Sequence, residues 1–497
     1  MVSEMKRQML AIDLGASSGR VMLGTYDQGN LQMKELHRFA NGPIEEDGHL
    51  RWDVPRLLAE IKCGLAKAVG SGPIDSLSVD TWGVDFGLLD EQGELLENPV
   101  HYRDNRTEGM CKAVDQWIPE KKLYEITGIQ RMEINTLFQL QALRMKNPEV
   151  LAKAKTLLFM PDLISYLLCG EMCCEYSIAS TSQMLDAKKR TWSEEILEGA
   201  GIRKDLFPKL VMPGTRIGTL KPELQEELGL GSVAVIAGAG HDTQSAMAAV
   251  PAMEEDFLFL SCGTWALFGT ELDKPCMSEM AAERQVTNEG GAGGMISFLK
   301  NIIGTWLIQE SRNQWKREGR EFSFGQLEEM ASQADAFTCL LDPDAPEFAA
   351  PGDMPARIRD YVRRTGQQIP ETEGAVVRCI NESLALKFRR AMEDIVACTG
   401  KKYQALYIVG GGCQSSLLCQ MTANACDCVV CAGPVEATVM GNLGIQLMAL
   451  GEMKDLKQLR AVVRASETCK RYVPDNAEAW RRIYQLAYMP DGMRSGT

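Results

Sequence analysis

Asp242 is the residue whose type and surroundings most directly indicate catalysis. It lies in Ala-Gly-Ala-Gly-His-Asp-Thr at 237–243, after an apolar run at 233–236 and before a predicted helix at 243–250. A carboxylate where a strand meets a helix can accept the proton of an attacking hydroxyl, which phosphoryl transfer requires. The same position suits a helix N-cap, because aspartate is preferred there. We expect one of these two roles.

Two turns rich in glycine and hydroxyl groups could hold phosphate. The first is Asp-Leu-Gly-Ala-Ser-Ser-Gly-Arg at 13–20, and the second is Leu-Ser-Cys-Gly-Thr-Trp at 260–265. Backbone N–H groups in such turns bind anions, and Asp13 at a strand end could hold Mg²⁺. Neither turn is a Walker A loop, because no Gly-Lys-Ser or Gly-Lys-Thr ends it. The alternative for each is an ordinary hairpin turn.

Three further segments could bind a nucleoside or a sugar. Val-Gly-Gly-Gly-Cys-Gln-Ser-Ser at 409–416 lies between a strand pattern and a helix, where bare backbone admits a flat base or ribose. It lacks the Gly-x-Gly-x-x-Gly spacing of dinucleotide sites. Thr-Trp-Gly-Val-Asp at 81–85 and Tyr-Arg-Asp-Asn-Arg at 102–106 offer an aromatic face and polar groups that suit a sugar. A core tryptophan and a surface ion-pair cluster are the alternative for these segments.

Strands and helices must alternate to position these residues. Apolar runs predict strands at 9–13, 19–26, 31–39 and 74–79, with a helix at 55–69. A meander of strands followed by alternating helices and strands predicts an α/β fold.

The pattern of strand, small-residue turn and strand occurs twice. Residues 10–25 show it first, and residues 257–271 repeat it near the middle of the chain. Two similar domains are therefore predicted, at 1–247 and 248–497, with the last helix packing back on the first domain.

The second half contains longer helical patterns. Helices are predicted at 301–317 and 375–399, and a strand at 405–409. The segment 342–370 is rich in proline and acidic residues and is predicted as a loop.

Composition excludes several classes of partner. The 497 residues carry a net charge of −14 and 45% hydrophobic residues, which suits two large domains and opposes binding to nucleic acid or anionic membranes. No apolar run suggests a signal peptide or a membrane span, so a cytoplasmic protein is expected. With four histidines, a histidine-rich metal centre is not expected. The cysteines scattered singly along the chain are expected in the core, and the denser group at 413–431 is expected in a buried strand and not at a zinc site.

The motifs, taken in order, resemble the rhamnulokinases within the FGGY carbohydrate kinases. The resemblance covers nearly the whole chain. It includes Asp-Thr-Trp-Gly-Val-Asp-Phe at 80–86, His-Asp-Thr at 241–243, Thr-Asn-Glu-Gly-Gly at 287–291 and Ala-Gly-Pro-Val-Glu-Ala-Thr at 432–438. Cys262 departs from the pattern, since serine is expected in that turn.

The resemblance implies two ribonuclease-H-like domains, as in actin-like ATPases, that flank a central cleft. It implies transfer of the γ-phosphoryl group of Mg·ATP to the 1-hydroxyl of L-rhamnulose, in L-rhamnose degradation. A related ketose (L-fuculose or L-xylulose) and a non-catalytic actin-like ATP-binding module are the alternatives.

The resemblance also assigns roles to individual residues. Asp242 would be the proton acceptor and Asp13 the carboxylate on the Mg²⁺ side. The sugar would be bound by Gly83, His241, Asp242 and Thr243. The ATP-binding residues would be Ala16, Ser17, Ser18, Gly19, Arg20, Thr264, Asn301, Gln309 and Gly411.

Overall fold

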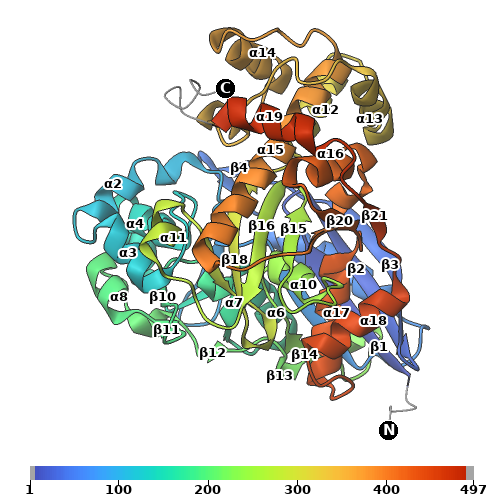
Figure 1. The fold of residues 1–497 in the computed structure, drawn as a ribbon. Helices are drawn as coiled ribbons and strands as arrows, with labels where there is room; N and C mark the ends of the chain where they lie inside the picture. Colours follow the sequence, from blue (N-terminus) through green and yellow to red (C-terminus); the bar gives the residue numbers. More distant parts are fainter. Residues whose placement is uncertain (1–5, 489–497) are drawn as a thin grey trace. The chain divides into compact units, whose positions relative to one another are not determined.

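The computed structural model describes residues 6–488, which divide into two compact units (Figure 1). The first unit comprises Met1–Pro251, Glu271–Phe298 and Ala437–Glu467, and the second comprises Ala252–Thr270, Leu299–Glu436 and Thr468–Thr497. The chain thus returns to the first unit late in the sequence. The division into domains at 1–247 and 248–497, with a returning last helix, stays a prediction.

The first unit is built on a six-stranded sheet in the order β13-β14-β6-β1-β2-β3. Strands β1, β2 and β3 form an antiparallel meander, whereas β6 is parallel to β1 and β14 is parallel to β6. The strands are β1 (Arg7–Leu14), β2 (Ser18–Asp27), β3 (Asn30–Ala40), β6 (Ser76–Thr81), β13 (Thr215–Thr219) and β14 (Ala234–Ala237).

Shorter strands pair outside this sheet. A hairpin joins β4 to β5, and β7 pairs with β8 in antiparallel fashion. These and the remaining strands of the unit are β4 (Ile44–Glu46), β5 (His49–Arg51), β7 (Phe86–Leu89), β8 (Thr156–Phe159), β9 (Cys174–Glu175), β10 (Leu185–Asp186), β11 (Thr191–Trp192), β12 (Leu210–Val211) and β17 (Thr287–Gly290).

Helix α1 covers the sheet because it buries an apolar face. Leu57, Ile61 and Leu65 of α1 lie in one core cluster with Ile12 and Val79 of the sheet. The helices are α1 (Val54–Ala66), η1 (Asn105–Thr107), α2 (Met110–Asp115), α3 (Glu120–Thr127), α4 (Thr136–Lys146), α5 (Pro148–Lys153), α6 (Met160–Cys169), α7 (Tyr176–Ser180), α8 (Glu194–Ala200), η2 (Lys204–Leu206), α9 (Pro222–Leu228), α10 (Asp242–Ala248), α11 (Glu279–Glu283), η3 (Ala292–Gly294), α17 (Ala437–Ala449) and α18 (Leu456–Ser466).

The late segment of the first unit packs against its earliest strands. Helix α17 contacts β1 and α10, and α18 contacts β3. Strands β1 and β3 are drawn in blue and helices α17 and α18 in orange-red, because they are far apart in the sequence (Figure 1). Gly441 makes the α17–α10 crossing possible, because a Cβ there would lie 1.7 Å from the Ser245 carbonyl oxygen. Gln446 of α17 donates to the Leu10 carbonyl of β1 at 3.0 Å.

The second unit repeats the same strand order. The seven-stranded sheet runs β17-β18-β16-β15-β19-β20-β21, and its order from β18 to β21 matches that of the first sheet. Strands β15 and β16 are antiparallel, and β19 is parallel to β15. The duplicated topology confirms the predicted repeat. The strands are β15 (Leu258–Cys262), β16 (Trp265–Leu272), β18 (Ile296–Ile303), β19 (Ala405–Val409), β20 (Val429–Ala432) and β21 (Lys470–Tyr472).

The helices of the second unit correct two predictions. The helix expected from residue 301 begins at Trp306, because β18 continues through Ile303. The segment 342–370, predicted as a loop, contains helix α14. Its N-cap is Asp353, whose side chain accepts from the Ala356 N–H. The helices are α12 (Trp306–Arg317), α13 (Phe324–Gln333), η4 (Pro346–Phe348), α14 (Met354–Arg364), α15 (Glu373–Thr399), η5 (Gly411–Gln414), α16 (Ser416–Cys426) and α19 (Ala477–Tyr488).

Candidate functional site

Three neighbouring strands of the first unit end at one edge of the sheet, and polar residues lie at or just after these ends. Parallel strands β1, β6 and β14 end at Leu14, Thr81 and Ala237. The chain beyond β14 stays beside β6, since Thr81 N–H donates to the Gly240 carbonyl at 2.8 Å. This contact places His241 opposite Thr81. Residues from distant parts of the sequence therefore meet at the carboxyl edge, where ligands bind in open α/β sheets.

Asp242 is the exposed point of an otherwise buried segment. It is partly exposed, while every other residue from Val233 to Ala252 is buried. His241 is the N-cap of α10 and Asp242 is its first residue, so the N-cap alternative for Asp242 is wrong. One oxygen, Oδ1, accepts from the N–H of Thr243 at 2.6 Å. Such a fixed, accessible carboxylate can act as a general base.

The pKa of Asp242 suits that role. Burial raises the pKa to about 6, Asp13 adds to the increase and His241 opposes it. The carboxylate is therefore mostly ionised at neutral pH, yet it is a stronger proton acceptor than an ordinary aspartate.

His241 connects Asp242 to a second, deeper carboxylate. Its Nε2 lies 3.5 Å from Asp242 Oδ1, and its Nδ1 lies 3.0 Å from Glu289 Oε2. Burial alone would lower the pKa of His241, but Glu289 and Asp242 outweigh it and raise the pKa above the usual value. Gln244 donates to Glu289 at 3.0 Å and fixes its position. The arrangement favours an imidazolium beside Asp242.

Gly83 faces this histidine from the loop after β6. It is the one partly exposed residue between Ser76 and Leu89. A Cβ on Gly83 would lie 3.5 Å from His241 Nε2 and 3.4 Å from Thr181 Cγ2. A side chain here would occupy the space beside His241, so glycine keeps that space open for a ligand.

Val84 holds this loop in a strained conformation. Its φ is +67°, in the left-handed region that β-branched residues rarely adopt. Three side chains hold the peptide in place. Val84 N–H donates to Thr181 Oγ1 at 3.1 Å, and the Val84 carbonyl accepts from Thr136 Oγ1 at 2.7 Å and from Gln139 Nε2 at 3.4 Å. Strain retained in this way is typical of ligand-binding loops.

Trp82 is a core residue. Its indole N–H donates to buried Asp85 at 3.0 Å, and its ring stacks on Trp52 with a centroid distance of 3.8 Å. Trp82 is 5% exposed, so the aromatic face predicted to meet a sugar lies in the core, and the alternative interpretation is correct. Gly83 is therefore the part of this motif that a ligand can reach.

Asp13 and Asp80 lie side by side in the register of β1 and β6. Asp13 also pairs with Arg20 across the β1–β2 hairpin. Asp80 is fully buried, and Asn442 of α17 donates to it at 2.6 Å. Burial raises the pKa of Asp80 well above its usual range, and Asp13 raises it further. Burial thus favours the protonated form of Asp80, whereas Asp13 has a charge partner in Arg20.

The turn between β1 and β2 presents Ala16, Ser17 and Ser18 at the surface, as phosphate binding requires. Asn41 fixes the turn, because its side chain donates to the Gly15 carbonyl at 2.8 Å. Glycine is required at position 19 for packing, since a Cβ there would lie 2.2 Å from the Phe39 ring.

In the second unit, Thr264 and Gln309 lie together at the turn of the β15–β16 hairpin. Thr264 Oγ1 donates to Gln309 Oε1 at 3.1 Å, and Gln309 Nε2 donates to Thr305 Oγ1 at 3.0 Å. Asn301, on β18, is partly buried.

The glycine run after β19 approaches the same turn. A Cβ on Gly412 would lie 2.3 Å from Cys262 Sγ, so glycine is required there for packing. Gly411 is exposed and a Cβ on it would meet no atom within 4 Å. Open backbone at Gly411 next to the Cys262–Thr264 turn suits a flat ligand.

Two residues of the first unit were not predicted as site residues. Glu289 follows from no local pattern, although it lies in the Thr-Asn-Glu-Gly-Gly motif at 287–291. Asp80 opens the Asp-Thr-Trp-Gly-Val-Asp motif, but only strand register places it beside Asp13.

Within residues 6–488, no group of three or more histidine, cysteine, aspartate or glutamate side chains is arranged to hold a metal ion. Over the same range, no helix has the length and hydrophobicity that crossing a membrane requires.

Comparison with known proteins identifies the family. The model of the FGGY carbohydrate kinase N-terminal domain matches residues 8–249, and that of the C-terminal domain matches residues 258–450. A rhamnulokinase of Bacteroides thetaiotaomicron is 44% identical over 97% of this chain and 98% of its own. One from Halalkalibacterium halodurans is 41% identical over 94% of this chain and 99% of its own.

Solved structures show the same fold. Ligand-bound xylulose kinase from Lactobacillus acidophilus has a TM-score of 0.79 at 19% identity, covering 97% of this chain and 96% of its own. Glycerol kinase from Plasmodium falciparum with ADP has a TM-score of 0.75 at 13% identity, covering 97% of both chains. The two-domain fold is therefore that of these kinases, and the chain belongs to the FGGY family of carbohydrate kinases.

Proposed function

We propose that the chain phosphorylates L-rhamnulose with ATP, in L-rhamnose degradation in the cytoplasm, giving L-rhamnulose 1-phosphate and ADP. The relatives at 44% and 41% identity are rhamnulokinases, and the match extends over nearly all of each chain. The observation that carries the proposal is the partly exposed Asp242 carboxylate beside His241 and opposite the open backbone of Gly83.

Asp242 is the proposed proton acceptor. The 1-hydroxyl of the sugar gives its proton to the carboxylate while its oxygen attacks the γ-phosphorus, and the bond to the ADP oxygen breaks. Thr243 N–H holds Oδ1, which leaves Oδ2 for the sugar hydroxyl. Because the protein mainly positions groups and removes one proton, a single base suffices.

His241 and Gly83 are proposed to bind the sugar, whereas Thr243 acts indirectly. The imidazolium favoured by Glu289 can donate a hydrogen bond to a sugar oxygen and compensate charge near Asp242. Thr243 is 4% exposed and its N–H contacts Asp242, so it positions the base.

ATP is proposed to use turns from both halves of the sequence. In the first unit these are Ala16, Ser17 and Ser18, with Arg20 beside Asp13. In the second unit they are Thr264, Gln309 and Gly411, with Asn301 on the neighbouring strand. Their open backbone and hydroxyl groups are of the kind that bind phosphate and ribose.

Mg²⁺ is the proposed cofactor and Asp13 the residue that would hold it. The donor set fits a hard cation, since Asp13 offers a carboxylate and its neighbour Asp80 offers an oxygen, Oδ1, that has no hydrogen-bond partner among the described residues. With so few protein ligands, phosphate oxygens and water would complete its coordination. When bound, the ion would neutralise charge on the phosphates.

The experiment that tests the proposal is an ADP-release assay with L-rhamnulose, L-fuculose and L-xylulose. The highest kcat/KM is expected with L-rhamnulose, and preference for another ketose would contradict the substrate assignment. Asp242→Asn should lower kcat by about 10²–10⁴-fold while nucleotide binding persists. Asp273→Asn, an exposed residue of the same unit, serves as the matched control.

A further inference from the structure

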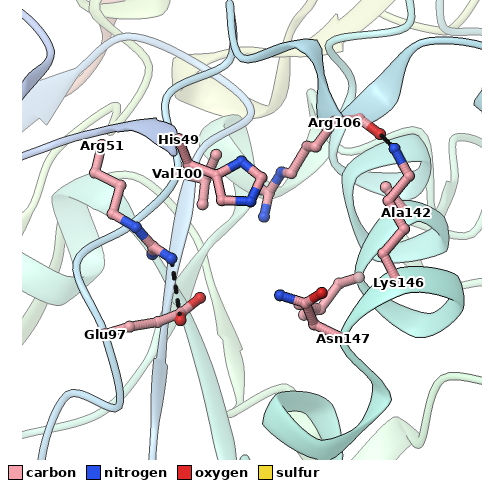
Figure 2. A pocket seen from close by; sticks show the side chains of 9 residues that line it. His49, Arg51, Glu97, Val100, Arg106, Ala142, Lys146 and Asn147 are labelled. Carbon is pink, nitrogen blue, oxygen red and sulfur yellow. Dashed lines mark hydrogen bonds and ion pairs between the residues drawn. The ribbon is translucent and has the colours of Figure 1, made fainter. Parts of the chain in front are cut away.

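A small pocket in the first unit has four basic side chains among the nine residues that line it (Figure 2). Strand β5 contributes His49 and Arg51, η1 contributes Arg106, and the end of α4 contributes Lys146. Glu97 is the one acidic residue among the lining side chains. The cavity offers about 40 Å³ to water centres. That is room for roughly three water molecules, so a ligand of only a few heavy atoms fits.

Arg51 is a buried cation whose hydrogen bonds are incomplete. It is 4% exposed and donates to the Asn98 carbonyl at 2.6 Å and to Glu97 Oε2 at 3.2 Å. Its Nε forms an ion pair with Glu46 Oε2 at 3.8 Å but has no hydrogen-bond partner among the described residues. A buried donor without an acceptor is costly, so the local structure favours additional acceptor oxygens near this guanidinium.

Arg106 has even less compensation. It is 9% exposed, and its guanidinium donates through Nη2 to a neutral group, Gln139 Oε1, at 2.6 Å. Within residues 6–488 it forms no ion pair at 4.0 Å or less. Burial lowers the pKa of Arg106 to about 10, although Asp85 and Asp104 oppose the change. Arg106 therefore remains a cation at pH 7 in a poorly solvated position.

Lys146 brings a third cation to the mouth of the pocket. Its Nζ donates to the Arg106 carbonyl at 2.8 Å, which uses one of its three donors (Figure 2). His49 also lines the pocket and contacts Asp104 at 3.1 Å. Three lysine or arginine side chains thus line the pocket with one carboxylate, that of Glu97, while Glu46 pairs with Arg51 from outside the lining.

We propose that this pocket is a binding site for a small oxyanion, of the phosphate or carboxylate type, held by Arg51, Arg106 and Lys146. Guanidinium groups match such oxygens in pairs, and a partly desolvated setting strengthens each bond. The size of the cavity excludes a nucleotide. The site does not depend on the proposed sugar or the proposed base.

The test is isothermal titration calorimetry of the full chain with inorganic phosphate and, separately, with acetate at matched ionic strength. Saturable binding is expected for at least one of them, and the comparison separates a phosphate site from a carboxylate site. Lys146→Gln should weaken that binding about tenfold, as loss of one charge-assisted bond predicts. Lys146 is exposed, so the variant should fold normally.

Lys153→Gln is the matched control, because it removes an exposed lysine from the adjacent helix α5 outside the pocket. Binding by this variant should equal that of the unmodified chain. Phosphate bound elsewhere, as in a nucleotide site, would be unaffected by either substitution. Identical isotherms for all three proteins, or no saturable binding of either anion, would overturn the proposal.

Discussion

The surroundings of the Asp242 carboxylate are expected to set the pH range in which the enzyme is active. Its pKa of about 6 means that the group must lose its proton before it can accept one from the sugar. We expect kcat/KM to be constant above about pH 7 and to fall about tenfold per unit well below pH 6. The measurement is a pH–rate profile with L-rhamnulose, with circular dichroism as a check on folding. An unchanged rate down to about pH 5 would contradict the assignment.

Glu289 is expected to control that profile from a distance. Its charge raises the pKa of His241, and a protonated His241 lowers the pKa of Asp242. Glu289→Gln should therefore leave Asp242 with a higher pKa and move the acidic limb of kcat/KM to higher pH. A purely structural role would lower activity equally at every pH. The exposed Glu283→Gln on α11 is the control and should leave the limb unmoved.

Substitution of Gly83 should weaken sugar binding without lowering the stability of the fold. A methyl group there would lie at ordinary contact distance, 3.4–3.5 Å from Thr181 and His241, so Gly83→Ala should fold with an almost unchanged melting temperature. The same methyl occupies space beside the base. We expect KM for the sugar to rise about tenfold or more, and an unaltered KM would remove Gly83 from the sugar site.

At the scale of elements, most strands could be predicted because their patterns are local. The strand predicted at 405–409 matches β19, and apolar runs also located β1, β2 and β3. Helix α14 was not predicted, because prolines and acidic residues in its vicinity suggested a loop. The continuation of β18 through Ile303 depends on pairing with the sheet, which no local pattern of 299–304 reveals.

In the candidate site too, residues in local motifs could be predicted, whereas those placed by tertiary contacts could not. Asp242 and Gly83 stand in motifs where a strand ends, so their place at the sheet edge could be predicted. The part of Asp80 in the site could not be predicted. Its protonation depends on burial, on Asp13 in the neighbouring strand β1, and on Asn442 from α17. These partners are distant in sequence, and only the tertiary fold brings them together.

The close crossing of α10 and α17 predicts that a larger residue at position 441 lowers stability. A Cβ on Gly441 would lie 1.7 Å from the Ser245 carbonyl oxygen, so Gly441→Ala must separate the two helices. Overpacking of this kind costs about 1–3 kcal/mol or more and outweighs the helix propensity of alanine. The melting temperature should fall. Gly325→Ala in α13, where a Cβ meets nothing within 4 Å, is the control and should cause no loss.

At the scale of the whole molecule, one topology occurs twice with different sequences. Each unit has an antiparallel meander followed by parallel strands, and each presents a hydroxyl-bearing turn between its first two strands. The repeat could be predicted because hairpin patterns are local. The return of residues 437–467 to the first unit could not, since it depends on packing of α17 and α18.

Ligand binding should stabilise the molecule if these turns hold a nucleotide. ATP that binds only the folded state adds about 2.7 kcal/mol at a concentration 100 times its Kd. A concentration-dependent rise in melting temperature is therefore expected by calorimetry. Thr264→Val, which removes the hydroxyl that contacts Gln309, should reduce the rise. A melting temperature independent of ATP would mean that the glycine-rich turns are structural only.

The strained Val84 peptide restricts how this enzyme can be redesigned. Its left-handed backbone is kept by Thr136 and Gln139 of α4 and by Thr181 at the end of α7. Changing any one of these anchors would let the loop relax and would shift Gly83 with it. New sugar preferences are therefore best sought by exchanging side chains around an intact loop, because altering the loop itself would disturb every neighbour at once.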